Sequence, residues 1–157
     1  MKLWRIAAST RSYAADDLSG AGAAKSPGRW NADWEPVVYC AAMASLAVLE
    51  TAAHVDSAGL PLNRFLVEID VPAAVWARRK SLRVATLDPS WAAVPAGLVS
   101  IRAGSRWLKL RSSALLQVPS VIVPEESATL INPAHADAAG IKAKVVRRFE
   151  YDLLFRS

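Results

Sequence analysis

Three strand-like segments follow one another towards the end of the chain: ALLQV (114–118), ATLI (128–131) and KAKVVRRFEY (142–151). Their β-branched and aromatic residues favour extended structure. Residues 3–7, 37–40 and 64–71 have the same character, and 64–71 alternates apolar with polar side chains. Strands that come in runs, with few helices between them, predict an α+β fold with one mixed sheet rather than a doubly wound parallel sheet.

One helix is predicted over 45–54. Leu46, Leu49 and Ala53 recur there at helical spacing, and Ser45 is a favourable N-cap residue. Residues 16–27 are rich in Gly, Ala and Ser, which predicts a long mobile loop. The stretch 72–110 has no clear period, and it predicts only short helical pieces over 73–80 and 88–91.

The 157 residues have the length of one ordinary domain, so we expect a single domain over 1–157. A hydrophobic content of 53% is enough to bury a core. Cys40 is the only cysteine, and no Cys/His cluster has metal-ligand spacing. The apolar run 37–49 is shorter than the about 20 residues that cross a bilayer, and the first residues do not resemble a signal peptide. We expect a cytoplasmic protein that binds neither a metal nor a membrane.

Charge is uneven along the chain, whose net charge is +5. Residues 61–120 hold nine Lys or Arg against three Asp or Glu. Such an excess is typical of a solvated face, or of a surface for an acidic protein or nucleic acid. Nucleic-acid binding is the less favoured alternative, because the arginines lack interleaved aromatic residues and lie on no clear recognition helix.

Glu50 is the first candidate for a functional residue. In the predicted helix it shares the face that Leu46, Leu49 and Ala53 make apolar. A carboxylate there is costly unless it is paired, and buried ionisable groups are enriched at functional sites. Helix geometry leaves two other interpretations open: a side chain that reaches water at the edge of the stripe, or an i,i+4 partner of His54.

Arg29 is the second candidate. It lies in Gly28-Arg29-Trp30-Asn31, and an arginine beside a glycine and an aromatic residue can act as a phosphate clamp, because the guanidinium binds two oxygens and the glycine lets a ligand approach the backbone. An ordinary surface arginine is the simpler alternative. Tyr39 and Ser120 both belong to predicted strands, where core packing is the usual role.

The motifs that contain these residues occur in the same order in a known family. Together with 45–50, 116–120 and 131–135, the segments around Arg29 and Tyr39 resemble the RES-domain family, toxins whose partner is an Xre-type antitoxin. The resemblance covers nearly the whole chain. It implies a fold similar to that of ADP-ribosyltransferase toxins, and an activity that cleaves the nicotinamide–ribose bond of NAD with inorganic phosphate or water as acceptor.

The resemblance also assigns residues by position. Arg29, Tyr39 and Glu50 match the arginine, tyrosine and glutamate of the family, and Ser120 is the best match for its serine, with Ser112 and Ser113 close by. Glu50 would stabilise the cationic ribose of the transition state. Arg29 would hold the pyrophosphate of NAD or the incoming phosphate, Tyr39 would stack on nicotinamide or wall the ribose, and Ser120 would donate a hydrogen bond. The resemblance implies no cofactor: NAD is expected as a substrate, and inorganic phosphate as a co-substrate.

The sequence therefore predicts the toxin of a bacterial toxin–antitoxin pair, an NAD phosphorylase that depletes NAD. An ADP-ribosyltransferase that modifies a protein is the main alternative, and a nucleic-acid-binding module is the other. The expected partner is an Xre-type antitoxin that covers the pocket mouth or blocks the 16–27 loop. A homodimer inside a larger complex is a further expectation.

Overall fold

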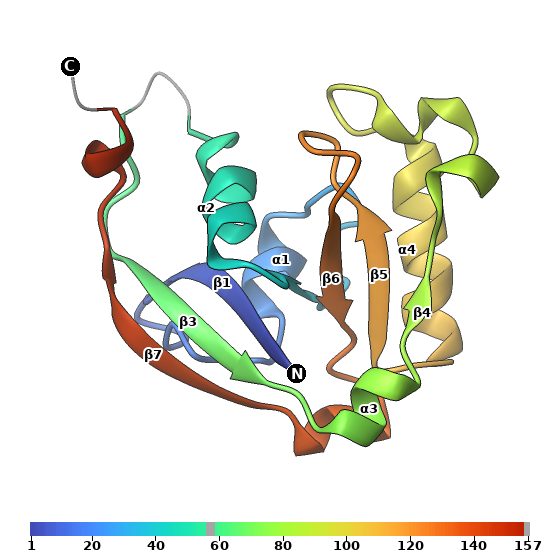
Figure 1. Ribbon diagram of the computed structural model, residues 1–157, viewed down its shortest axis with the longest axis horizontal. Coiled ribbons are helices and arrows are strands. Elements are labelled where there is room, and N and C mark those ends of the chain that lie inside the picture. Colours follow the sequence, from blue (N-terminus) through green and yellow to red (C-terminus); the bar gives the residue numbers. More distant parts are fainter. Residues whose placement is uncertain (56–58, 156–157) are drawn as a thin grey trace.

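The computed structural model describes residues 1–55 and 59–155, and Figure 1 shows its single sheet with helices on both sides. Seven strands form a sheet of order β4-β5-β6-β2-β1-β3-β7, in which only the β4–β5 pair is parallel. The strands are β1 (Lys2–Ala8), β2 (Val38–Ala41), β3 (Arg64–Asp70), β4 (Lys80–Ser81), β5 (Leu115–Pro119), β6 (Ser127–Ile131) and β7 (Lys142–Phe149). The α+β fold with one mixed sheet is confirmed.

Four α-helices and four short 3-10 helices complete the described chain. They are α1 (Ala21–Lys25), α2 (Ala44–Ala52), α3 (Ala73–Ala77) and α4 (Leu98–Leu110), with η1 (Val84–Thr86), η2 (Pro89–Ala92), η3 (Ala136–Gly140) and η4 (Tyr151–Leu154). α2 packs on β1 and β2, whereas α4 packs against η2. No helix of the described residues is long and apolar enough to cross a bilayer.

Successive side chains of each strand point to opposite faces of the sheet, so the apolar core has one part on each face. One face carries the largest apolar cluster, which includes Leu3, Cys40 and Val67. On the other face, one cluster gathers around Trp30, Trp91 and Trp107 beside α4, and another lies against α2. The candidate residues Arg29, Tyr39 and Glu50 are carried by the loop that holds Trp30, by β2 and by α2.

The helix α4 is the longest element that the sequence did not predict. Its residues fell in the stretch 72–110, which was expected to be irregular. The inner face of α4 carries Val99, Ala103 and Trp107, each four residues after the last, beside the buried Gly104. Gly104 is needed because a Cβ atom there would lie 1.7 Å from the carbonyl oxygen of Trp30. The apolar period of a helix was therefore present in this part of the stretch, and the prediction of irregular structure is wrong there.

Several other predicted elements need correction. The predicted loop 16–27 contains α1, which follows Gly20 in a left-handed conformation with φ of 76°. The helical piece over 73–80 ends at Ala77, and the two residues of β4 follow. Ser45 is not the N-cap of α2, because Met43 occupies that position without a side-chain hydrogen bond. The remaining strands begin and end within two residues of the prediction.

Candidate functional site

Glu50 is the seventh residue of α2, and one of its carboxylate oxygens has an unusual environment. The Oε1 atom is buried, and among the described residues it has no hydrogen-bond partner. The predicted apolar stripe around it is wrong, since Leu49 is 41% exposed and Ala53 is exposed, while the helix buries Leu46 and Ala47. Six of the nine residues of α2 are apolar and they lie around most of the helix, so periodicity could not identify its buried side. Glu50 is still half-buried.

The alternative pairing of Glu50 with His54 is not found. His54 lies beyond the end of α2 and is exposed. The ion pairs of the described residues do not include one between these two side chains. The positively charged group near Glu50 is therefore not His54 but a residue from another part of the fold.

Arg29 supplies this charge from the loop between α1 and β2. Its Nη1 atom donates hydrogen bonds to the carbonyl oxygens of Trp91 (2.9 Å) and Ala93 (2.7 Å). Burial lowers the pKa of the Arg29 guanidinium, and the nearby Glu50 and Tyr39 act in the opposite direction. The fold thus brings the three residues into one electrostatic environment. Nη1 is committed to the backbone at η2, which leaves the other guanidinium nitrogens for a ligand.

Tyr39 lies on β2, and its hydroxyl is engaged on both sides. The hydroxyl donates to Asn31 Oδ1 (2.8 Å) and accepts the Trp30 N–H (3.0 Å). Burial raises the pKa of the phenol above its usual value, so Tyr39 stays neutral. Gly28 lies against the ring: a Cβ atom there would be 2.7 Å from Tyr39 Cζ. The glycine of the motif therefore makes room for the Tyr39 ring, whereas the sequence suggested that it makes room for a ligand.

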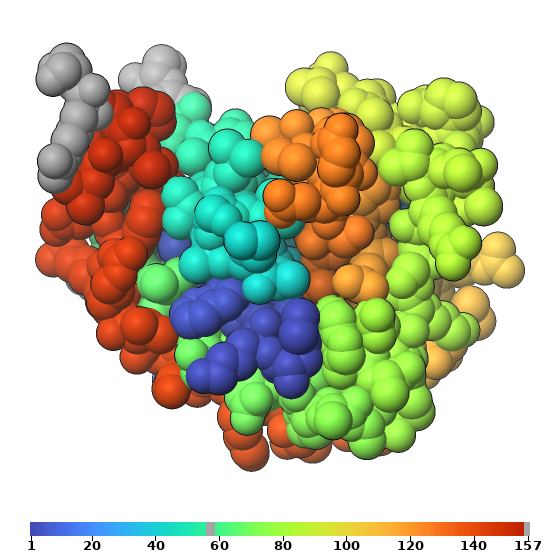
Figure 2. Space-filling model, viewed as in Figure 1, coloured from blue at the N-terminus to red at the C-terminus, as the bar shows by residue number. Residues whose placement is uncertain are grey.

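Two of the three serines have structural contacts. Ser120 directly follows β5, and its Oγ accepts the backbone N–H groups of Ile122 (3.2 Å) and Val123 (3.0 Å), which holds the β5–β6 turn. Val123 packs against Leu46 and Ala47, and Figure 2 shows this turn beside α2. Ser120 itself is buried, with an exposed fraction of 2%.

Neither of the other two serines joins the three candidate residues. Ser113 is buried, accepts from Trp107 Nε1 (2.9 Å) and donates to the Leu115 carbonyl (2.8 Å). Ser112 is exposed.

A separate hollow of about 670 Å³ lies at the other end of β2 and β6. Pro36 precedes β2 and Asn132 follows β6, whereas α2 follows the opposite end of β2. Trp34, which is 80% exposed with φ of 66°, forms part of its wall. The lining contains none of the four candidate site residues: it is Ser19, Trp34, Glu35, Pro36, Leu108, Lys109, Arg111, Asn132, Pro133 and Ala134.

The basic middle of the chain is partly paired. Arg78 binds Asp137 at 2.8 Å, Arg79 Nε donates to Gln117 at 2.8 Å, and Lys109 lies 3.7 Å from Glu35. The described residues form no cluster of three or more side chains that could hold a metal ion.

Comparison with known proteins identifies the family. A family model described as "RES domain" matches residues 2–153. The chain belongs to the RES-domain family. It is 56% identical to the "Prs ADP-ribosylating toxin" of Sphingobium sp. (strain YBL2), over 95% of this chain and 92% of that protein. It is 37% identical to the "Toxin Res" of Pseudomonas putida KT2440, over 92% of this chain and 93% of that protein.

A solved structure supports the fold of this RES domain. The crystal structure of the M. tuberculosis MbcT–MbcA toxin–antitoxin complex contains a chain that superposes with a TM-score of 0.61 at 18% identity. The match covers 93% of the RES domain and 84% of that chain.

Two components of the site were not found from the sequence. The carbonyls of Trp91 and Ala93 receive Arg29, and backbone acceptors leave no trace in a sequence pattern. Asn31 stood inside the quoted motif, but its contact with the Tyr39 hydroxyl depends on how the loop folds back.

Proposed function

We propose that this RES domain transfers the ADP-ribosyl group of NAD, cleaving the bond between nicotinamide and ribose. The observation that carries the proposal is the Oε1 atom of Glu50, which is buried, has no hydrogen-bond partner in the part of the chain that the structure describes, and lies in the same electrostatic environment as Arg29. An acceptor oxygen that is withdrawn from water and left without a partner costs free energy in the folded protein. Such a cost is expected where a ligand supplies the missing contact.

The chemistry fits these groups. The C1′–N bond breaks, its electron pair leaves with nicotinamide, and the ribose develops oxocarbenium character. The Glu50 carboxylate would stabilise that positive charge or accept a ribose hydroxyl. The free donors of Arg29 would bind the pyrophosphate of NAD. An acceptor oxygen then forms the new bond to C1′ and releases its proton.

The acceptor is the finer part of the proposal. The relative at 56% identity is named for ADP-ribosylation of Prs, which favours a protein acceptor of that kind for this chain. Inorganic phosphate, which would make the enzyme an NAD phosphorylase, is the second candidate. It is favoured by the guanidinium donors that Arg29 retains beside the site.

A partner protein belongs to the same proposal. The structural neighbour was solved as a toxin–antitoxin complex, and we infer that an antitoxin, of the Xre type that the family resemblance implies, binds this chain. Three exposed apolar side chains lie on or next to the elements that carry or contact the site residues: Met43 at the N-cap of α2, Leu49 on α2 and Val94 beyond η2. An antitoxin that covers them would close the site.

The test is incubation of the purified chain with NAD in three reactions: alone, with inorganic phosphate, and with purified Prs. Nicotinamide release with ADP-ribose attached to Prs would support the protein acceptor. A phosphorylated ADP-ribose that forms only with phosphate would support the phosphorylase, and plain ADP-ribose in every reaction would indicate a glycohydrolase.

Two variants test whether the activity depends on Glu50. Glu50→Gln should abolish nicotinamide release, whereas Glu150→Gln, a change to an exposed glutamate at the end of β7, should leave it at the wild-type rate. Intact NAD in all three wild-type reactions would contradict the proposal, and so would normal turnover by folded Glu50→Gln.

A further inference from the structure

We propose that Asn31 is a positioning residue of this site: it fixes the Tyr39 ring and the backbone next to Arg29, and itself binds no substrate. The inference rests on the proposed function, because positioning has meaning only for a reaction at Glu50. Asn31 is fully buried, with an exposed fraction of 0%. A buried amide at the centre of a loop has to satisfy all its polar atoms within the protein.

The Asn31 oxygen holds two parts of the site together. Oδ1 accepts the hydroxyl of Tyr39 at 2.8 Å and the backbone N–H of Gly28 at 2.9 Å. Gly28 is the residue before Arg29, so this one oxygen fixes the start of the Arg29 segment relative to the Tyr39 side chain. Asn31 therefore sets the distance between the Arg29 segment and the Tyr39 side chain, which a flexible loop would leave variable.

The Asn31 nitrogen fastens the same loop at its other end. Nδ2 donates to the carbonyl oxygens of Ala23 in α1 (2.9 Å), Ala32 (3.2 Å) and Glu35 (3.0 Å). The loop from α1 to the start of β2 is therefore wrapped around one amide group. The positions of both Arg29 and Tyr39 depend on it.

These contacts also limit what Tyr39 can do. Its single hydroxyl hydrogen is given to Asn31, and the oxygen accepts the Trp30 N–H. Tyr39 consequently offers its ring, and not its proton, to a ligand. Misplacement of a site group by about 1 Å can lower a reaction rate by about 100-fold. Loss of the Asn31 hydrogen bonds should therefore lower turnover, because the Tyr39 ring would shift.

Asn132 supplies a matched control. It too is a buried asparagine, 1% exposed, whose Nδ2 donates to the Leu108 carbonyl (3.0 Å) and whose Oδ1 accepts the Ala134 N–H (3.0 Å). It follows β6, at the end of the sheet away from α2. A purely structural asparagine should therefore behave like Asn132.

The experiment compares Asn31→Ala, Asn132→Ala, Tyr39→Phe and the double variant Asn31→Ala/Tyr39→Phe. The assay measures nicotinamide release at varied NAD, and unfolding in urea gives the folded fraction. We expect Asn31→Ala to lower kcat by about 10- to 100-fold with a smaller change in the KM for NAD. Asn132→Ala should keep the wild-type kcat per folded molecule, and the double variant should lose no more than the worse single variant.

Several results would overturn the inference. Equal kcat per folded molecule in Asn31→Ala and Asn132→Ala would show that Asn31 only stabilises the fold, and losses that multiply in the double variant would show that Asn31 does not act through Tyr39. If Asn31→Ala does not fold, the test rests on Tyr39→Phe, which removes only the hydroxyl that Asn31 holds. Tyr39→Phe must then lower kcat, and an unchanged kcat would refute the inference. A wild-type chain that leaves NAD intact would instead refute the proposed function, and the inference with it.

Discussion

At the scale of single residues, Glu50 and Glu68 show how differently the fold treats two carboxylates. Glu68 on β3 binds Lys2 (3.1 Å) and Lys144 (3.0 Å), and these contacts lower the pKa of its carboxyl group. Glu50 has one buried oxygen without a partner among the described residues. The first carboxylate supports the sheet, whereas the second costs the folded state about 1–3 kcal/mol.

Replacement of Glu50 by an apolar side chain of similar length should therefore separate stability from activity. We expect Glu50→Met to melt at the wild-type temperature or a few degrees higher, since 1 kcal/mol corresponds to about 2–4 °C in a domain of this size. NAD turnover should be lost. Calorimetry and the nicotinamide assay measure the two quantities, with Glu68→Met as the control that lowers the melting temperature. A clear fall in the melting temperature of Glu50→Met would mean that its carboxylate is structural.

At the scale of elements, α4 supports the site from behind. Trp30, next to Arg29, presents its carbonyl to Gly104 of α4, and its ring stacks on Trp91 with centroids 6.0 Å apart. Trp91 in turn offers its carbonyl to Arg29. The longest helix, η2 and the Arg29 loop are thus packed as one unit.

Gly104→Ala should disturb this unit. The added Cβ would meet the Trp30 backbone at 1.7 Å, which no side-chain rotation can relieve. We expect a loss of about 1–3 kcal/mol in the free energy of unfolding, together with reduced NAD turnover. Urea unfolding measures the first. Gly140→Ala is the control, because its Cβ would be at an ordinary 3.6 Å from Pro72. Wild-type stability of Gly104→Ala would show that the helix and loop can move apart.

The same elements show what a sequence can and cannot reveal. Alternation and β-branched residues predicted six of the seven strands to within two residues, because their buried sides are apolar. The two residues of β4 are too few to carry such a signal. The helix α4 did carry one, in Val99, Ala103 and Trp107, but the sequence prediction missed it. Glu50 became a candidate as a charged group on a predicted apolar stripe, and Arg29 through its place between a glycine and an aromatic residue. The role of Asn31 was missed because it depends on backbone carbonyls.

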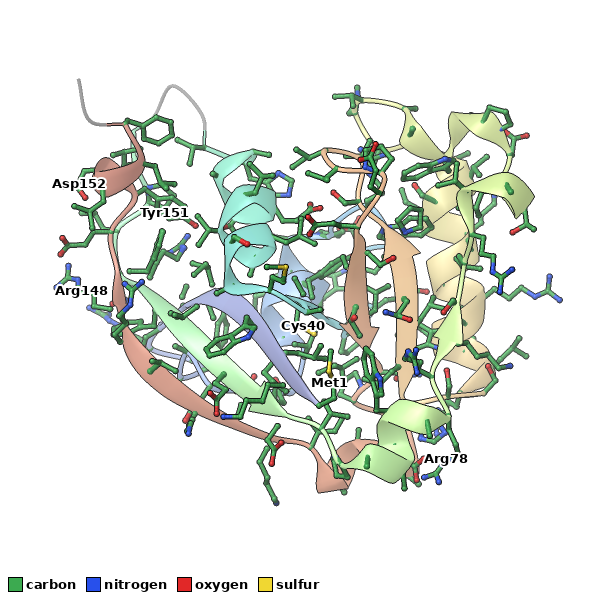
Figure 3. The ribbon with its side chains drawn as sticks, viewed as in Figure 1. Met1, Cys40, Arg78, Arg148, Tyr151 and Asp152 are labelled. Carbon is green, nitrogen blue, oxygen red and sulfur yellow. The ribbon has the colours of Figure 1, made fainter. Side chains whose placement is uncertain are left out.

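At the scale of the whole molecule, the centre of the sheet keeps two weak acids protonated. Burial raises the pKa of the Cys40 thiol to about 12, and it raises the pKa of the Tyr39 phenol as well. Both residues lie on β2, in the middle of the sheet, where Figure 3 labels Cys40. The folded state holds these protons more tightly than the unfolded chain does.

The free energy of unfolding should therefore fall in alkali. A raised pKa in the folded state gives stability that is complete below the unfolded value, about 8.5 for Cys and about 10 for Tyr, and that is lost as the pH rises towards the folded value. Urea unfolding between pH 8 and pH 11 should show the decline, with a shallower slope for Cys40→Ala. Constant stability over this range, or equal slopes in the two proteins, would contradict the prediction.

The stacked pair of Trp30 and Trp91 gives the molecule an optical property. Their rings are 22° from parallel, both are buried, and Trp91 lies in the segment whose carbonyls receive Arg29. Two indoles held this close and this rigidly couple their electronic transitions, and the circular dichroism of such a pair depends on their relative orientation. The near-ultraviolet spectrum of the unlabelled protein thus carries a signal from the back wall of the site, and it registers any shift of that wall when a nucleotide or a protein binds.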